Sequence, residues 1–189
     1  IRDGGDGKRI LFLEEVQSDW AQQYKNCQLS SNKDNWCPPI PPWLQEWEIL
    51  AIKLCILHAC HLGVDGIAWT DGGVQHERYQ LVEALGLVRF YDEILPRVIN
   101  RLLSRHGLFC KKIPVFIDYD YLQESSDGEM DYDDELASVV SVSGSGGSDN
   151  GSMSHSRIME KMPGVLFSED QRKAILIEGW FAWGDGIKR

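Results

Sequence analysis

The sequence lacks any run of about 18 apolar residues, the length that a helix needs to cross a bilayer. It also shows no basic segment followed by an apolar one near its start. We therefore expect neither a membrane span nor a signal peptide, and we expect a cytoplasmic protein.

The five cysteines are an odd number, and without a secretory signal they argue against a disulfide framework. We expect reduced thiols, although Cys27 and Cys37 flank one loop and could pair under oxidising conditions. The cysteines and histidines of residues 55–61 lack the paired spacing of a structural zinc site. Core packing explains them better because buried cysteine is common, so we predict no metal site.

Basic residues are missing from positions 118–135, which hold nine acidic ones. This segment accounts for nearly all of the formal net charge of -10, so the rest of the chain is close to neutral. A surface that mimics DNA would need its charge spread over the fold, which argues against that class. A Ser/Gly-rich tract follows, and we interpret residues 118–156 as a flexible insertion. The same composition also fits a surface loop without a role.

The rest of the chain, residues 1–117 and 157–189, has the size and apolar content of one globular domain. Apolar runs and turn signals predict strands at 9–16, 66–70 and 108–117, the last being the final strand. Periodicity predicts helices at 43–62, at 74–106 with breaks near Gly86 and Pro96, and at 169–178. We therefore predict an α/β or α+β fold with a small central sheet, a helical crossover and a C-terminal helix.

Several local features refine this prediction. Residues 2–8 have the composition of a hairpin turn, so we expect a strand upstream and the chain to be a fragment of a longer product. Ser168 and Gln171 form a capping box at the start of the last helix. The remaining expectations are an extended proline-rich connector at 38–42, one apolar stripe on helix 43–62 (Trp47, Leu50, Leu54, Leu57, His58, His61), and an aromatic clasp of Trp180, Phe181 and Trp183.

Two polar clusters follow the first two predicted strands. Loops at the ends of core strands are held by a rigid scaffold while their side chains face a ligand, so we expect these clusters to form one site. The first cluster contains Glu14, Glu15, Gln17, Ser18, Asp19 and Trp20, and the second follows Trp69 and Thr70 with Gln75, Glu77, Arg78 and Tyr79.

The residue types suggest roles for the members of this site. We assign Glu15 as general base or ligand acceptor, Gln17 and Gln75 as orienting amides, and Arg78 as an anion clamp. Supporting, substrate-binding positions are assigned to Asp19, Trp20, Trp69, Glu77 and Tyr79. On a strand Glu15 and Gln17 would share one face, which could be partly buried.

Simpler explanations stay open for both clusters. Glu15 could form a salt bridge with Arg78 or Lys53 at the end of its strand. The Gly72 and Gly73 amides could hold an anion, or they could simply begin a helix.

A basic stripe at i, i+4 and i+8 is formed by Arg97, Arg101 and Arg105, with Lys111 and Lys112 nearby. The stripe is a weak indication of nucleic-acid binding, because the sequence shows no aromatic platform interleaved with it. A solvated face is the commoner explanation.

The polar clusters, in order, resemble a domain of the polyvalent proteins of bacteriophages and conjugative or mobile elements. The matching blocks are residues 14–20, 69–70, 75–79 and 90–100, with a weaker one at 168–172. The resemblance spans residues 8–117 and 164–181, implies a bacterial host's cytoplasm, and brings no established activity. The element order also loosely resembles GNAT acetyltransferases, but residues 17–22 replace their glycine-bearing loop, so coenzyme A binding is unsupported and no cofactor is predicted.

Two hypotheses follow. The first is a phage or mobile-element accessory domain whose acid, amide and arginine site binds a small anionic ligand, or acts on it as a transferase or hydrolase. The second is a non-catalytic interaction module that binds a host protein through the acidic segment. Neither hypothesis requires a membrane.

Overall fold

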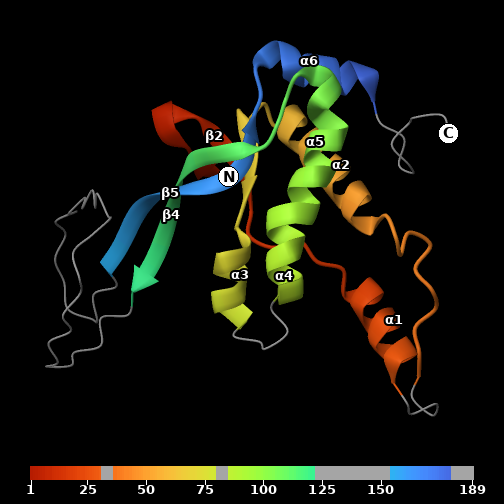
Figure 1. Cartoon of the computed structure of the whole chain (residues 1–189). Coiled ribbons are helices and arrows are strands. Elements are labelled where there is room, and N and C mark those ends of the chain that lie inside the picture. Colours follow the sequence, from red (N-terminus) through yellow and green to blue (C-terminus); the bar gives the residue numbers. More distant parts are fainter. Residues whose placement is uncertain (31–35, 80–84, 122–153, 180–189) are drawn as a thin grey trace, which may run out of the picture.

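The computed structural model describes residues 1–30, 36–79, 85–121 and 154–179 (Figure 1). These residues form a mixed fold in which helices pack against one five-stranded sheet, so the predicted class is confirmed. In sheet order, the strands are β1 (Arg2–Asp3), β2 (Arg9–Leu13), β3 (Gly66–Trp69), β5 (Ser154–Leu166) and β4 (Lys111–Tyr121). The helices are α1 (Asp19–Leu29), α2 (Trp47–His61), α3 (Gly72–Tyr79), α4 (Leu85–Arg89), α5 (Leu95–Leu103) and α6 (Glu169–Glu178).

The predicted crossover between the first two long strands is confirmed. β2 runs parallel to β3, with Ile10 opposite Gly66 and Leu13 opposite Trp69, and α2 lies in the connection between them. Parallel neighbours place their carboxyl ends at the same edge of a sheet. The two polar clusters therefore begin side by side.

The prediction that the strand at 108–117 is the last one was wrong. β5 follows it and lies between β3 and β4, antiparallel to both. The predicted insertion thus begins inside β4 and ends inside β5, and residues 122–153 lie outside the described part. The sequence did not predict the start of β5 because residues 154–161 are mostly polar or charged, as is usual where one face of a hairpin is exposed. At Gly164 an added Cβ would lie 2.7 Å from the Ile67 carbonyl oxygen, so glycine allows β3 and β5 to approach.

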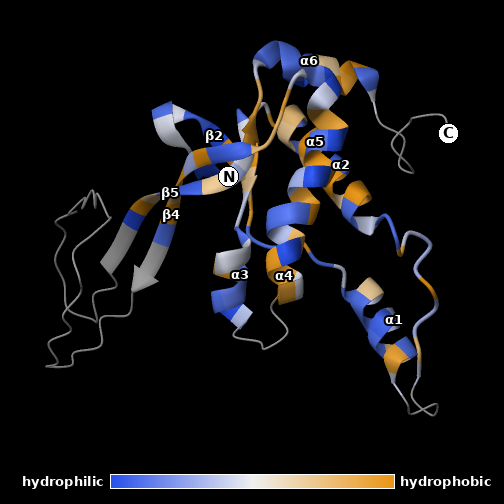
Figure 2. Ribbon diagram, viewed as in Figure 1, coloured by the Kyte–Doolittle hydropathy of each residue, from blue (hydrophilic) through white to orange (hydrophobic). Residues whose placement is uncertain are grey.

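Apolar side chains cover both faces of the sheet. Ile67 and Trp69 belong to the larger core, which they share with α2, α5 and α6, whereas Ala68 points into a smaller core on the other face. Figure 2 colours much of α2, α5 and β3 as hydrophobic, and these elements supply residues of the larger core. In the described part of the chain, no helix is both long and apolar enough to cross a membrane.

The stripe expected on α2 was wrong. The buried face carries Ile49, Ile52, Lys53, Ile56, Ala59 and Cys60. Leu54 is 58% exposed, and His58 and His61 are also exposed. Periodicity failed because α2 is apolar on most sides, so its sequence does not mark which side meets β3, α5 and α6.

The helical region at 85–106 runs through α4, a π-helical turn (Phe90–Ile94), α5 and a 3-10 turn (Ser104–His106). The chain therefore stays helical through Pro96, which occupies the first turn of α5, where its missing N–H group costs little. The helix at 169–178 and its capping box of Ser168 and Gln171 are confirmed.

The segment around α1 corrects the cysteine prediction. Cys27 and Cys37 form a disulfide, since the chain brings their Cα atoms to 5.6 Å, while Cys55, Cys60 and Cys110 stay free. The strand β1 is the first arm of the N-terminal hairpin, so its partner lies within the chain rather than upstream. The residues of the expected aromatic clasp lie outside the described part.

Candidate functional site

The two polar clusters meet at one backbone atom, the carbonyl oxygen of Glu14. It accepts hydrogen bonds from Gln75 Nε2 at 2.7 Å, Thr70 Oγ1 at 3.0 Å and Arg78 Nη1 at 3.4 Å. Gln75 Nε2 also lies 2.5 Å from Thr70 Oγ1. The two clusters are therefore in contact, as expected. The contacts are made to the Glu14 backbone rather than to the side chains of Glu15 or Gln17.

Gln75 holds the loop that follows β2. Its side chain is fully buried, and both described bonds come from its Nε2 atom, while Oε1 has no partner among the described residues. An amide buried in this way fixes the Glu14 backbone. The proposed role of Gln75 in orienting a ligand would have to act through that loop.

Glu15 and Tyr79 form the exposed edge of the site. The Tyr79 hydroxyl donates a short hydrogen bond to Glu15 Oε1, and this contact raises the pKa of Tyr79. β2 ends at Leu13, so the strand alternation expected for residues 15 and 17 does not apply and both side chains are exposed. Arg78 is exposed too, and its Nη1 group donates a hydrogen bond to the Glu14 carbonyl oxygen.

Tyr91, to which the sequence analysis gave no role, holds the same loop at Val16. Its hydroxyl accepts from the Val16 amide at 2.8 Å and donates to the Val16 carbonyl at 3.3 Å. Burial raises the pKa of Tyr91, against a smaller opposing effect of the Val16 amide. Its own carbonyl accepts from Trp69 Nε1 at 3.2 Å, and this fully buried Trp69 is a core residue rather than a ligand contact.

The remaining predicted residues lie around α1 and α3. Asp19 is exposed in the first turn of α1, whose N-cap is Ser18. Trp20 donates from Nε1 to the Pro39 carbonyl at 2.8 Å and packs edge-on against Trp43, so it anchors α1 to the proline-rich connector. Glu77 is exposed on α3 and has no described contact in this site.

The Gly72 and Gly73 turn is already occupied by carboxylates of the protein. Asp92 Oδ1 accepts from the Gly72 amide at 2.8 Å, and Asp71 Oδ1 accepts from the Val74 amide at 3.1 Å. Burial would raise the pKa of Asp71, but Lys112, at 3.0 Å from Oδ2, and the turn amides outweigh it and lower that pKa. The helix-starting explanation is therefore the one that fits.

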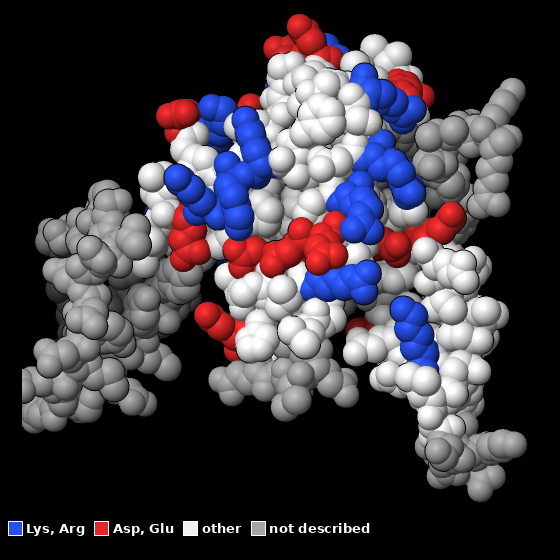
Figure 3. Space-filling model, in the orientation of Figure 1, with Lys and Arg blue, Asp and Glu red and all other residues white. Residues whose placement is uncertain are grey.

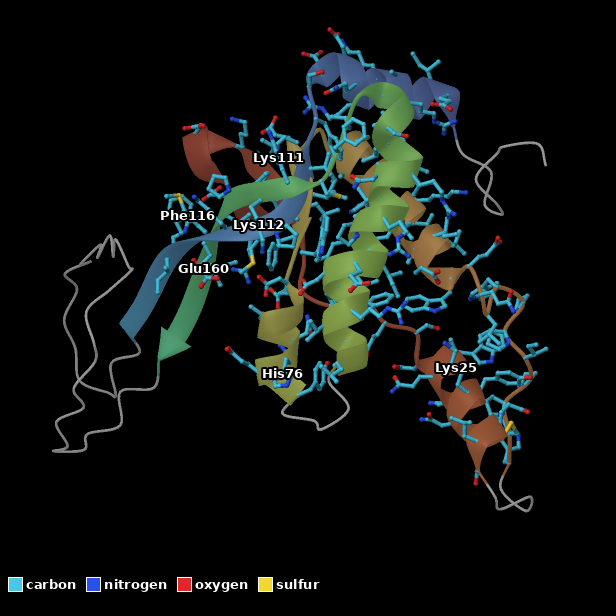
Figure 4. The ribbon with its side chains drawn as sticks, viewed as in Figure 1. Lys25, His76, Lys111, Lys112, Phe116 and Glu160 are labelled. Atoms are coloured by element: carbon cyan, nitrogen blue, oxygen red, sulfur yellow. A yellow bond between two sulfur atoms is a disulfide. The ribbon has the colours of Figure 1, made fainter. Side chains whose placement is uncertain are left out.

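A groove of about 250 Å³ opens beside Val16, Gln17 and Ser18. One wall is the α1 face with Ala21, Gln22, Lys25 and Asn26, and the other carries Trp47, Leu87 and Phe90. Trp47 and Phe90 stack with their ring centroids 5.6 Å apart and an interplanar angle of 18°. Lys25, labelled on α1 in Figure 4, is the charged side chain of the lining. The groove therefore combines an aromatic wall with amides and one cation.

Sequence reasoning missed Lys25, Trp47, Phe90 and Tyr91 as members of this region. Phe90 and Tyr91 lie in the block at 90–100 that carries the family resemblance, which was the available signal. No such signal pointed to Lys25 or Trp47, because their proximity depends on how α1 and α2 pack.

The described residues contain no group of three or more His, Cys, Asp or Glu side chains that could hold a metal ion. Within residues 55–61 the two histidines are exposed and Cys60 is buried, where burial raises the pKa of its thiol to about 11. On the basic stripe Arg105 pairs with Glu178, and Arg97 and Arg101 are exposed.

Comparison of the chain with protein-family models, with curated proteins and with solved structures found no match.

Proposed function

We propose that this chain is a binding domain for a small anionic ligand with a flat apolar part, and that the ligand lies in the groove between α1 and the α4 region. The carrying observation is the lining itself. Lys25 and the amides of Gln17, Gln22 and Asn26 face a wall that includes the stacked rings of Trp47 and Phe90. Small-molecule sites commonly combine such an apolar wall with a few convergent polar groups.

The proposed groove adjoins the first polar cluster of the sequence. Val16 and Gln17 line the groove, and the adjoining Glu15 and Tyr79 form the exposed edge described above. The setting as a phage or mobile-element accessory domain in a bacterial cytoplasm rests on the sequence resemblance.

A transferase or hydrolase activity on the bound ligand is the second candidate, favoured by the Glu15 and Tyr79 pair. A carboxylate that already accepts a proton-bearing hydroxyl can take a proton from a substrate group that replaces the phenol. Arg78 lies beside the pair with donors left for an anion. In this catalytic hypothesis Glu15 acts as the general base and Arg78 binds the anionic group of the ligand.

The binding proposal is tested by titrating isotope-labelled protein with nucleoside monophosphates and with aromatic carboxylates while amide NMR shifts are recorded. We expect shifts confined to residues 16–26 and to the surroundings of Trp47 and Phe90. Lys25→Gln should weaken binding about 10-fold to 150-fold, because a charged hydrogen bond contributes about 1.5–3 kcal/mol. The matched control Lys173→Gln removes an exposed cation of α6 and should leave binding unchanged.

If Lys25→Gln leaves the affinity unchanged, or if the amide shifts appear at residues outside the groove, the groove is not the binding site. For the catalytic version, Glu15→Gln should abolish turnover of a bound ligand without weakening its binding. Equal loss of both would leave Glu15 as a binding residue only.

A further inference from the structure

An exposed aromatic side chain, Phe109, lies along the chain between the cations of α5 and those of the β4 and β5 hairpin. Phe109, in the turn before β4, is 58% exposed. The adjacent amide of Cys110 donates to Asn100 Oδ1 at 2.7 Å, and the Cys110 thiol approaches the Pro96 carbonyl at 3.6 Å. These contacts hold the turn against α5, next to Arg97 and Arg101.

The first group of cations lies on α5. Arg97 and Arg101 are one helical turn apart and exposed, and the contacts of Pro96 and Asn100 place both beside the Phe109 turn. Neither has a carboxylate partner within the described residues. Arg105 extends the stripe, but Glu178 already neutralises it.

The second group lies at the start of the β4 and β5 hairpin. Lys111 and Lys112 open β4, where Figure 4 labels them, and both are exposed. Lys161 lies opposite Pro114, which places it on the same face as Lys112. Lys112 pairs with Asp71, whereas Lys161 has no acidic partner in the part of the chain that the structure describes. Lys111 alternates with Lys112 and therefore projects from the other face of β4.

The two groups form one basic surface. Figure 3 shows Lys and Arg side chains gathered over the hairpin and over the α5 side of the same face, with uncharged surface between them and a band of Asp and Glu below. We name Arg97, Arg101, Phe109 and Lys161 the basic aromatic face.

We propose that the basic aromatic face binds single-stranded nucleic acid, with its three cations contacting phosphates and a base stacking on Phe109. Positive grooves with exposed aromatic rings are the general solution for single strands, because every base offers a π face. The proposal favours single strands over duplex because the bases of a duplex are already stacked on each other. It is independent of the groove at α1.

A second aromatic residue on the hairpin supports the choice of Phe109. Phe116 lies on the same strand face as Lys112, but the Arg157 guanidinium covers its ring at 4.8 Å from the centroid. Phe116 is therefore capped within the protein, while Phe109 is open to a base.

The test uses the full chain and a fluorescent thymidine oligonucleotide, with binding followed by anisotropy as the salt concentration varies. Phe109→Leu should weaken binding about 5-fold to 150-fold and leave the salt slope unchanged, since stacking contributes about 1–3 kcal/mol per base. The pair Arg97→Gln and Lys161→Gln should reduce the slope by about 1.4, because each contact to a single strand contributes about 0.7.

Two matched controls accompany these variants. Phe116→Leu removes the capped ring, and the pair Arg89→Gln with Lys173→Gln removes two cations that carboxylates four residues away on the same helix already neutralise. Both controls should bind as the parent does. No binding at low salt, an equal loss in the controls, or duplex bound as tightly as the single strand would overturn the proposal.

Discussion

Tyr91 and Val16 are 75 positions apart, and the Tyr91 hydroxyl is hydrogen-bonded to both the amide and the carbonyl of Val16. A single side chain thereby holds the loop that leads from β2 into α1. Because Val16 also lines the groove, the same contact positions the proposed ligand site.

Tyr91→Phe should lower the free energy of unfolding by about 1–3 kcal/mol, because it leaves two partly buried backbone groups without their partner. Urea unfolding followed by circular dichroism measures the change. Tyr24→Phe is the control, since the Tyr24 hydroxyl on α1 has no hydrogen bond within the described residues. An equal effect of both substitutions would mean that the Val16 contact contributes nothing specific.

Gln75 and the exposed site residues should respond differently to substitution. Gln75→Met removes the buried donor to the Glu14 carbonyl and should cost about 1–3 kcal/mol of stability. Arg78→Ala and Glu15→Gln should each cost less than about 0.5 kcal/mol, as is usual for exposed positions. Losses of about 2 kcal/mol or more in both exposed variants would indicate a stabilising buried pair instead.

Reduction of the disulfide between Cys27 and Cys37 should loosen α1 more than the sheet. Closing a loop of this size stabilises a fold by about 2–3 kcal/mol in the chain-entropy view. Limited proteolysis with and without dithiothreitol should show new cleavage between residues 20 and 40, with the remainder protected. The double variant Cys27→Ser and Cys37→Ser should be cleaved in the same way without reductant. If dithiothreitol does not change the cleavage pattern of the parent, the disulfide does not hold α1 in place.

Acid should weaken the contact between Asp71 and Lys112. The folded state lowers the pKa of Asp71 below its ordinary value of 3.8, so its contribution is complete above that pH and is lost as the pH falls through the folded pKa. Lys112→Met should be less stable than the parent by less than about 1 kcal/mol at neutral pH, since the pair is half exposed. The difference should shrink in acid, and urea midpoints at a series of pH values would show whether it does.

We predict that the acidic residues of the segment 118–135 compete with nucleic acid for the stripe of Arg97, Arg101 and Arg105. Since β4 extends to Tyr121 and β5 begins at Ser154, a deletion that spares the sheet replaces residues 122–153 with a short glycine-serine turn. We expect tighter binding to heparin and to single-stranded DNA at low salt, because the tether raises the local concentration of competing carboxylates. The gain should fade as salt rises. An unchanged affinity would make the segment a solvated loop.

The sequence by itself determined the elements whose signals are local. The parallel pairing of β2 with β3 follows from two apolar runs joined by a helix, and the start of α6 follows from the reciprocal hydrogen bonds of Ser168 and Gln171. The meeting of the two polar clusters was predictable for the same reason, because parallel strands end at one edge.

Only the tertiary structure decided which atoms meet there. Gln75 and Arg78 reach the Glu14 carbonyl rather than a side chain, because β2 ends before Glu15 and the loop turns away from the strand pattern. The buried face of α2, the place of β5 between β3 and β4, and the position of Phe109 beside α5 likewise depend on contacts distant in sequence. Periodicity reports how residues are spaced along one element, whereas these features depend on which neighbouring element packs against it.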